Sequence, residues 1–187
     1  MDIMNYYGAK EMAASFRTVR KNTLQIAEEI PEDKYGYRPA EGVKTVGELL
    51  AHIALGVKFQ ERINLVEKRT TLVGFDFPKL MGELMAEQAK PRTKAEIVAL
   101  LTSEGEKFAK ALEALTDDFL GQSVSMPPGV EPGVRTRFDM LASVKEHEMH
   151  HRGQLMLIER MLGITPHLTR AMQERMAAMQ AAANQKQ

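Results

Sequence analysis

The chain has 187 residues, the length of one ordinary domain, of which 44% are hydrophobic and 27% are charged. Lysine and arginine number 25, and aspartate and glutamate also number 25, so the formal net charge is zero. Proteins that bind nucleic acid usually concentrate basic residues on one face, so we expect no nucleic-acid partner. The absence of cysteine excludes disulfides, a cysteine nucleophile and thiolate metal ligands from this protein.

The sequence also leads to expectations about location and domain organisation. The first ten residues lack the basic and then apolar pattern of a secretory signal. No apolar run approaches the roughly 20 residues that span a bilayer. We therefore expect a soluble cytoplasmic protein with no membrane partner. Residues 1–180 are expected to form one domain, and residues 181–187 a frayed tail.

Two helices are predicted in the first part of the chain. The first ends at Pro31, and its inward positions are spaced by three and four residues. They are Phe16, Val19, Thr23, Ile26 and Ile30. After a loop over residues 31–44, Thr45 and Glu48 have the pattern of a capping box, in which each side chain accepts a hydrogen bond from a free backbone N–H at the helix start. The second helix is therefore predicted over residues 45–68.

Two long helices and one short helix are predicted in the rest of the chain. Residues 93–115 begin with the same capping-box pattern, at Thr93 and Glu96. Residues 136–162 form the fourth helix, which a glycine and a proline end. Residues 169–179 are rich in alanine and methionine, which favours a short C-terminal helix.

The connections between these helices are long. Residues 69–92 have room for a short extra helix around Pro78 to Gln88. Residues 116–135 contain three prolines, so we expect them to be irregular, and no segment shows the alternation of a strand. Crossovers of this length are typical of a bundle that is not a simple up-and-down repeat. The prediction is an all-α four-helix bundle with long crossover loops and a short C-terminal helix.

Two histidines interrupt the apolar stripe of the predicted fourth helix. His147 and His151 are four residues apart, so their Cβ atoms lie roughly 5–6 Å apart on one face of the helix. That spacing lets both imidazoles reach one ion through metal–nitrogen bonds of about 2.0–2.1 Å. The rest of the stripe consists of Val144, Leu155, Ile158 and Leu162.

His52 interrupts the corresponding stripe of the second helix, and Gly56 follows it one turn later on the same face. A glycine there allows another helix or a ligand to approach closely. A single histidine in such a stripe is most often a hydrogen-bonded core residue. Three buried imidazoles without partners, however, would cost about 1–3 kcal/mol for each unsatisfied polar atom. A shared divalent metal would satisfy His52, His147 and His151 together.

Several segments resemble the DinB/YfiT-like family, also called the DinB superfamily. The run KEHEMHHRGQL over residues 145–155 is similar to the family's fourth-helix signature. Residues 35–39 and 45–52 resemble the family's first loop and second helix, and residues 162–166 resemble its exit from the fourth helix. The resemblance covers nearly the whole chain.

The resemblance implies a four-helix bundle, a homodimer and a three-histidine site for zinc, nickel or a similar divalent ion. The ligands that it implies in this chain are His52, His147 and His151. Family members of known activity include transferases and isomerases that depend on a thiol cofactor, which makes a low-molecular-weight thiol the second expected cofactor.

Three nitrogen ligands leave coordination positions open, as in catalytic metal sites. Such a metal can bind a thiol as thiolate or lower the pKa of bound water. Because the chain has no cysteine, the sulfur would have to come from a small thiol. The leading hypothesis is therefore a metal-dependent thiol transferase or related enzyme that acts on a small-molecule substrate.

Two alternatives stay open. Residues 147–151 are a literal H-E-x-x-H motif, in which Glu148 would be the general base of a metallohydrolase. Gln154 stands where the extended metzincin form of that motif has glycine, so we expect Glu148 to be solvated or to lie beside the ligands instead. The other alternative is a non-catalytic, metal-stabilised stress-response or interaction module.

The sequence also gives expectations for residues outside the three-histidine group. His150 is expected near the site or on the surface, and His167 in a loop. Gly153 is expected to allow close helix packing. A methionine stripe near the C-terminus is expected to form a dimer contact or to dock on the bundle; it consists of Met172, Met176 and Met179.

Overall fold

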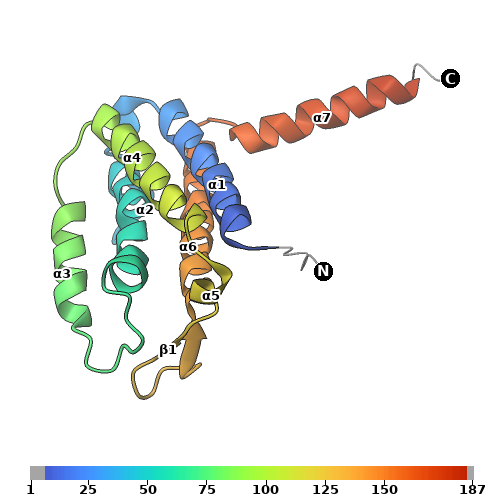
Figure 1. Ribbon diagram of the computed structural model, residues 1–187. Helices are drawn as coiled ribbons and strands as arrows, with labels where there is room; N and C mark the ends of the chain where they lie inside the picture. The colour runs from blue at the N-terminus through green and yellow to red at the C-terminus, as the bar shows by residue number, and fades with distance from the viewer. Residues whose placement is uncertain (1–6, 185–187) are drawn as a thin grey trace.

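A computed structural model describes residues 7–184, which form an all-α bundle with one small hairpin (Figure 1). In chain order the elements are α1 (Ala9–Glu29), the 3-10 turn η1 (Glu32–Lys34), α2 (Val46–Gln60), the π-helical turn η2 (Glu61–Val66), α3 (Phe77–Gln88), α4 (Lys94–Glu113), α5 (Asp117–Leu120), β1 (Ser123–Ser125), β2 (Val134–Thr136), α6 (Arg137–Met161) and α7 (His167–Asn184). The predicted fold class is confirmed.

Helices α1, α2, α4 and α6 form the four-helix bundle. α1 packs against α4 and α6, and α2 packs against the same two helices. The consecutive helices α1 and α2 therefore lie at opposite corners of the bundle. Long crossovers make this arrangement possible, as expected from the sequence. Helix α3 lies outside the bundle beside α2, and α7 extends away from the bundle (Figure 1).

The capping boxes form at the predicted positions. The Thr45 hydroxyl accepts from the Glu48 N–H at 3.2 Å, and the Glu48 carboxylate accepts from the Thr45 N–H at 2.7 Å. The pair Thr93 and Glu96 makes the same two contacts at the start of α4. Because these bonds satisfy backbone groups that a helix start leaves free, they explain why α2 and α4 begin where they do.

The connection over residues 116–135 differs from the prediction. It holds the short helix α5 and the strands β1 and β2, which pair antiparallel with Val124 opposite Arg135. The expectation of irregular structure without strands was wrong because three-residue strands are too short to show alternation. The hairpin is anchored by one side chain, since Val124 is fully buried.

The second and the last helix also have bounds that differ from the prediction. α2 passes into η2 and the chain leaves it before Lys68, whose φ of +48° cannot continue a right-handed helix. The last helix begins at His167 and runs to Asn184, so residues 181–184 are helical, while residues 185–187 lie outside the described part. His167 is buried at the start of α7 instead of lying in a loop.

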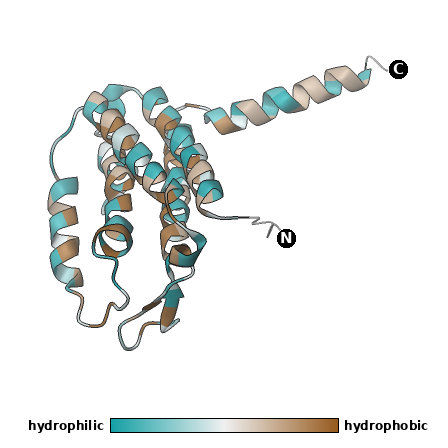
Figure 2. Ribbon diagram, in the orientation of Figure 1, coloured by the Kyte–Doolittle hydropathy of each residue, from teal (hydrophilic) through white to brown (hydrophobic). Residues whose placement is uncertain are grey.

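Figure 2 shows apolar and polar residues alternating along the bundle helices, and most of the apolar residues of these helices are buried. One cluster packs around Leu50, Ile53 and Leu101, and a second around Phe16 and Phe108, whose rings meet edge to face at 5.1 Å. No helix within residues 7–184 has the length and hydropathy needed to cross a membrane.

A buried ion pair connects all four helices of the bundle. The Arg20 guanidinium on α1 lies 2.9 Å from the Glu148 carboxylate on α6, and both residues are at most 4% exposed. The same guanidinium donates to the carbonyl of Ile53 on α2 and to that of Leu101 on α4. Gly105 makes room for it, because a Cβ at that position would lie 2.8 Å from Arg20 Cγ.

Replacing Glu148 by alanine should destabilise the metal-free protein by about 3–5 kcal/mol, because Arg20 would remain buried without a counter-charge. Urea unfolding of the variant and of the parent protein measures this difference. Glu146, which is exposed on the same helix, is the matched control, and Glu146→Ala should change the stability by less than about 0.5 kcal/mol. Equal stabilities of the two variants would contradict the role of the ion pair.

Candidate metal centre

The packing of α2 against α6 brings three histidine side chains together. His52 is on α2, and His147 and His151 lie one turn apart on α6. The Nε2 atom of His52 is 3.0 Å from that of His147 and 3.1 Å from that of His151, and the two α6 nitrogens are 3.2 Å apart. The three histidines singled out from the sequence therefore form one cluster, and they are the group of side chains within residues 7–184 that could hold a metal ion.

Two glutamine side chains orient this cluster. The Oε1 atom of Gln88 lies 3.0 Å from His52 Nδ1, and the Oε1 atom of Gln154 lies 2.8 Å from His151 Nδ1. An amide oxygen only accepts hydrogen bonds, so both Nδ1 atoms carry the proton and both Nε2 atoms carry a lone pair. Two lone pairs 3.1 Å apart repel each other. A cation between them would turn this repulsion into two bonds.

The separations fit a metal ion. Two nitrogens bonded at about 2.0–2.1 Å, at the angles of octahedral or tetrahedral coordination, lie about 2.8–3.4 Å apart. The three observed distances of 3.0–3.2 Å fall within that interval. Neutral imidazole nitrogens suit zinc and nickel. The donor set and its spacing are therefore appropriate for the divalent ion expected from the sequence.

Gly56 gives His147 its space. A Cβ atom at position 56 would lie 3.0 Å from His147 Cε1 and 3.1 Å from His147 Nδ1, closer than side chains normally come. A larger residue at position 56 would require the His147 ring to shift by a few tenths of an ångström, whereas glycine lets it lie against α2 as it does. The structure agrees with the close approach expected at Gly56.

Burial keeps the three imidazoles neutral. Burial, together with the neighbouring imidazoles, lowers the pKa of His147 to about 4. Burial also lowers the pKa values of His52 and His151, although the bonds to Gln88 and Gln154 oppose this effect. All three groups are thus in the metal-binding protonation state at neutral pH, and protons compete for them only below the ordinary imidazole pKa of about 6.5.

A model of the DinB superfamily matches residues 15–155 of the chain. The chain belongs to the DinB superfamily. YjoA of Bacillus subtilis, described as uncharacterized, is 27% identical over 158 residues, which are 84% of this chain and 92% of YjoA. The crystal structure of YjoA, described as DinB-like, superposes with a TM-score of 0.57 at 24% identity and covers 83% of this chain and 93% of its own.

Two further DinB structures have the same fold. YfiT of Bacillus subtilis has a TM-score of 0.65 at 17% identity, covering 88% of this chain and 93% of YfiT. It is described as a probable metal-dependent hydrolase with an unusual four-helix bundle topology. A DinB-family protein of Exiguobacterium sibiricum has a TM-score of 0.58 at 19% identity, covering 85% of this chain and 95% of its own.

Glu148 does not lie where the glutamate of an H-E-x-x-H metallohydrolase would act as the general base. Its carboxylate lies in the core, bonded to Arg20, and not beside the histidine nitrogens or in solvent. One residue along a helix is a rotation of about 100°, which turns Glu148 away from the face that carries His147. The carboxylate that a zincin uses as its base is therefore a structural group in this DinB protein.

Other expected site residues fall around the cluster. His150 is exposed on α6 at the edge of the site, with its ring 4.8 Å from that of His151 and its Nε2 atom 3.3 Å from the side-chain nitrogen of Gln154. Gly153 has no atom within 4 Å of a Cβ built on it, so the expected close packing there was wrong. The orienting role of Gln88 was missed, because nothing in the spacing of α3 indicates which of its residues faces α2.

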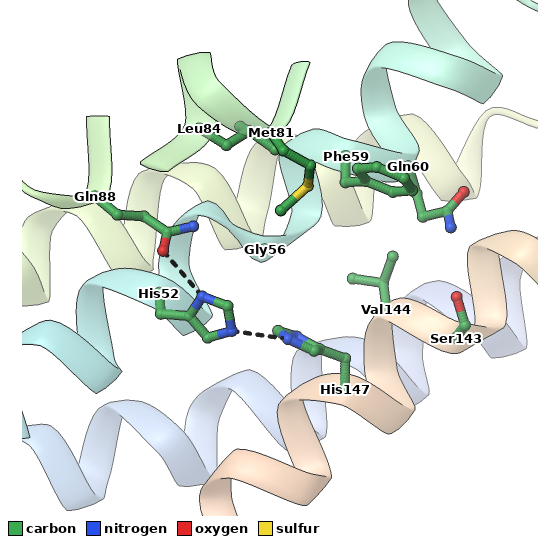
Figure 3. A pocket seen from close by; sticks show the side chains of 10 residues that line it. All are labelled: His52, Gly56, Phe59, Gln60, Met81, Leu84, Gln88, Ser143, Val144 and His147. Atoms are coloured by element: carbon green, nitrogen blue, oxygen red, sulfur yellow. Dashed lines mark hydrogen bonds between the residues drawn. The ribbon is translucent and has the colours of Figure 1, made fainter. Parts of the chain in front are cut away.

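Two hollows flank the cluster. A cavity of about 290 Å³ lies against His52 and His147, between α2, α3 and α6 (Figure 3). On the other side, a groove of about 400 Å³ lies against His151 and Gln154, beside the loop that carries Lys44. The cluster therefore stands between two spaces, so a bound ion would be accessible to small molecules.

Replacing any one of the three histidines by alanine should abolish stoichiometric metal binding, and replacing Gln88 by alanine should weaken it about tenfold to a hundredfold by freeing the His52 ring. Elemental analysis of protein purified in zinc or nickel, followed by competition with a chelator, measures both effects. His150→Ala is the control and should bind metal like the parent protein. Full metal content in His52→Ala would refute the three-histidine centre.

Proposed function

We propose that this DinB protein is a metal-dependent thiol transferase that holds zinc or nickel at His52, His147 and His151. The observation that carries the proposal is the meeting of three neutral imidazole nitrogens beside a cavity whose described lining holds no cysteine, lysine or carboxylate. A bound divalent cation would lower the pKa of a thiol and so supply a thiolate at neutral pH. The sulfur would come from a low-molecular-weight thiol.

The lining of the cavity supports a nucleophile from outside the protein. The described residues around it include no lysine, no carboxylate and no cysteine. The hydroxyl proton of Ser143 is engaged in a hydrogen bond to the carbonyl of Met140. In the proposed transfer, the sulfur forms a bond to an electrophilic carbon, the leaving group departs with its electron pair, and the thiol proton passes to solvent.

The chain's own residues would orient the two reactants. Gln88 and Gln154 hold the His52 and His151 rings so that their Nε2 atoms face the centre. The cavity beside His52 would exclude water from the electrophile. We place the thiol in the groove beside His151, where Lys44, which makes no ion pair within residues 7–184, can attract an anionic group of the thiol.

The hydrolase described for YfiT is the second candidate, since a three-nitrogen site is also suited to activating water. The burial of Glu148 counts against it in this chain, because that carboxylate cannot act as a base at the centre. A non-catalytic, metal-stabilised module is the third possibility. The three functions can be distinguished by the reaction, if any, that the metal-loaded protein catalyses.

The test is a colorimetric assay of zinc- and nickel-loaded protein with 1-chloro-2,4-dinitrobenzene and bacillithiol, mycothiol or glutathione. We expect at least one thiol to react, and we expect the rate to fall about 100-fold or more with His52→Ala and on chelation, as when an essential catalytic group is lost. Hydrolysis of a p-nitrophenyl ester without any thiol would favour the hydrolase. A lower melting temperature on metal removal, with no turnover of any compound, would favour the module.

We further propose that the protein acts in the cytoplasm as a homodimer held by α7. This helix buries only His167, and it carries an exposed apolar stripe. The stripe consists of Met172, Met176 and Met179, each more than half exposed. Apolar side chains in a row on an isolated helix are typical of an interface between proteins.

The dimer should be visible in sedimentation velocity of the whole chain at micromolar concentration. Met176→Asp would place a charge in the interface and should shift the protein to the mass of a monomer. Met149→Asp changes an exposed methionine on α6 and should leave the dimer intact. A monomeric parent protein would refute the proposal.

A further inference from the structure

The cavity beside the metal centre has three walls. α2 contributes His52, Gly56 and Phe59, α6 contributes Val144 and His147, and α3 closes the outer side. Figure 3 shows the Met81 and Leu84 side chains extending from α3 over the space in front of the two imidazoles. A molecule in the cavity would therefore touch α3 on one side and the centre on the other.

The walls are apolar and carry no charge. Phe59, Met81, Leu84 and Val144 supply most of the surface, and the described lining includes no ionisable side chain apart from the two histidines. The Gln60 side-chain oxygen already accepts from Asn64 at 2.8 Å. Away from a bound ion, an ionised group in this space would lose its hydration without gaining a counter-charge from the walls, which costs several kcal/mol. The lining therefore selects against charged compounds.

The volume limits the size of the compound. A cavity of about 150 Å³ holds one benzene ring. The cavity beside His52 measures about 290 Å³. Two fused aromatic rings, or an aliphatic group of comparable volume, would fill it.

Helix α3 is the adjustable wall. It packs on α2 outside the bundle and buries only Leu80 fully, while Met81 remains 43% exposed at the cavity mouth. A methionine is unbranched and flexible, so it adapts to groups of different shape. The same helix ends at Gln88, which orients His52. Occupation of the cavity and orientation of the His52 ring thus depend on one element.

We propose that the electrophilic substrate is an uncharged, largely apolar compound of up to two fused rings, bound between α2, α3 and α6, and that Met81 and Leu84 determine which compounds fit. This assignment rests on the proposed function for the reaction, but it makes a claim about binding that can be measured without turnover. Leu84 is half-buried in the wall, so enlarging it should fill the cavity without disturbing the core.

The experiment is calorimetric titration of zinc-loaded protein with 1-naphthol and with 1-naphthylmethylammonium. We expect 1-naphthol to bind, and we expect Leu84→Trp to weaken it at least about tenfold by filling the space. The control is Met85→Trp, the same insertion at an exposed α3 position outside the cavity lining. The ammonium compound should bind at least about tenfold more weakly than 1-naphthol because of its charge.

Unchanged 1-naphthol affinity in Leu84→Trp, or equal affinities for the two compounds, would overturn the proposal. Zinc content is measured in every variant and should stay at the parent value, which separates a filled cavity from a damaged centre. In the transfer assay, Leu84→Trp should raise the KM for the electrophile and leave the KM for the thiol unchanged. If 1-naphthol binds as expected and no thiol is turned over, the proposed function fails and the binding assignment stands.

Discussion

The geometry of the centre depends on the ion pair between Arg20 and Glu148. Arg20 reaches from α1 to backbone carbonyls of α2 and α4 and to the carboxylate of Glu148 on α6. Glu148 follows His147 directly in the sequence, so fixing its direction fixes the rotation of α6 about its own axis. That rotation turns His147 and His151 toward α2, where His52 meets them. An ion pair in the core thus sets the positions of the three histidines on its border.

Gln88 and Gln154 also contribute to the geometry of the centre, but they orient single rings, whereas the ion pair orients a whole helix. The ion pair sets where the rings are, and Gln88 and Gln154 set which nitrogen of His52 and His151 carries the proton. Gly56 leaves the third ring, that of His147, the space that it needs. Each imidazole is therefore constrained by a different neighbour, and the centre is preorganised by residues from α2, α3 and α6.

Much of the bundle and the histidine cluster could be predicted, because both follow from local spacing. Capping boxes and the three- and four-residue periodicity depend on neighbours within one turn, so they gave the helix starts and the shared face of His147 and His151. The partner of Glu148 could not be found in this way, since Arg20 lies 128 residues away. The role of Gln88 could not be predicted for a related reason, because it depends on how α3 packs against α2. The strands β1 and β2 could not be predicted because they are too short to show a periodic pattern.

The diagonal placement of α1 and α2 also determines when the centre can form as the chain is synthesised. Because each of these helices packs mainly on α4 and α6, α1 and α2 lack their main packing partners until the later helices have been synthesised. The bundle closes only when α6, the last of its four helices, is available. α6 brings two of the three imidazoles and the counter-charge of Arg20 in the same step. Nascent chains that stop before α6 therefore lack both the assembled core and the three-histidine cluster, so a site for the proposed metal forms only when folding is completed.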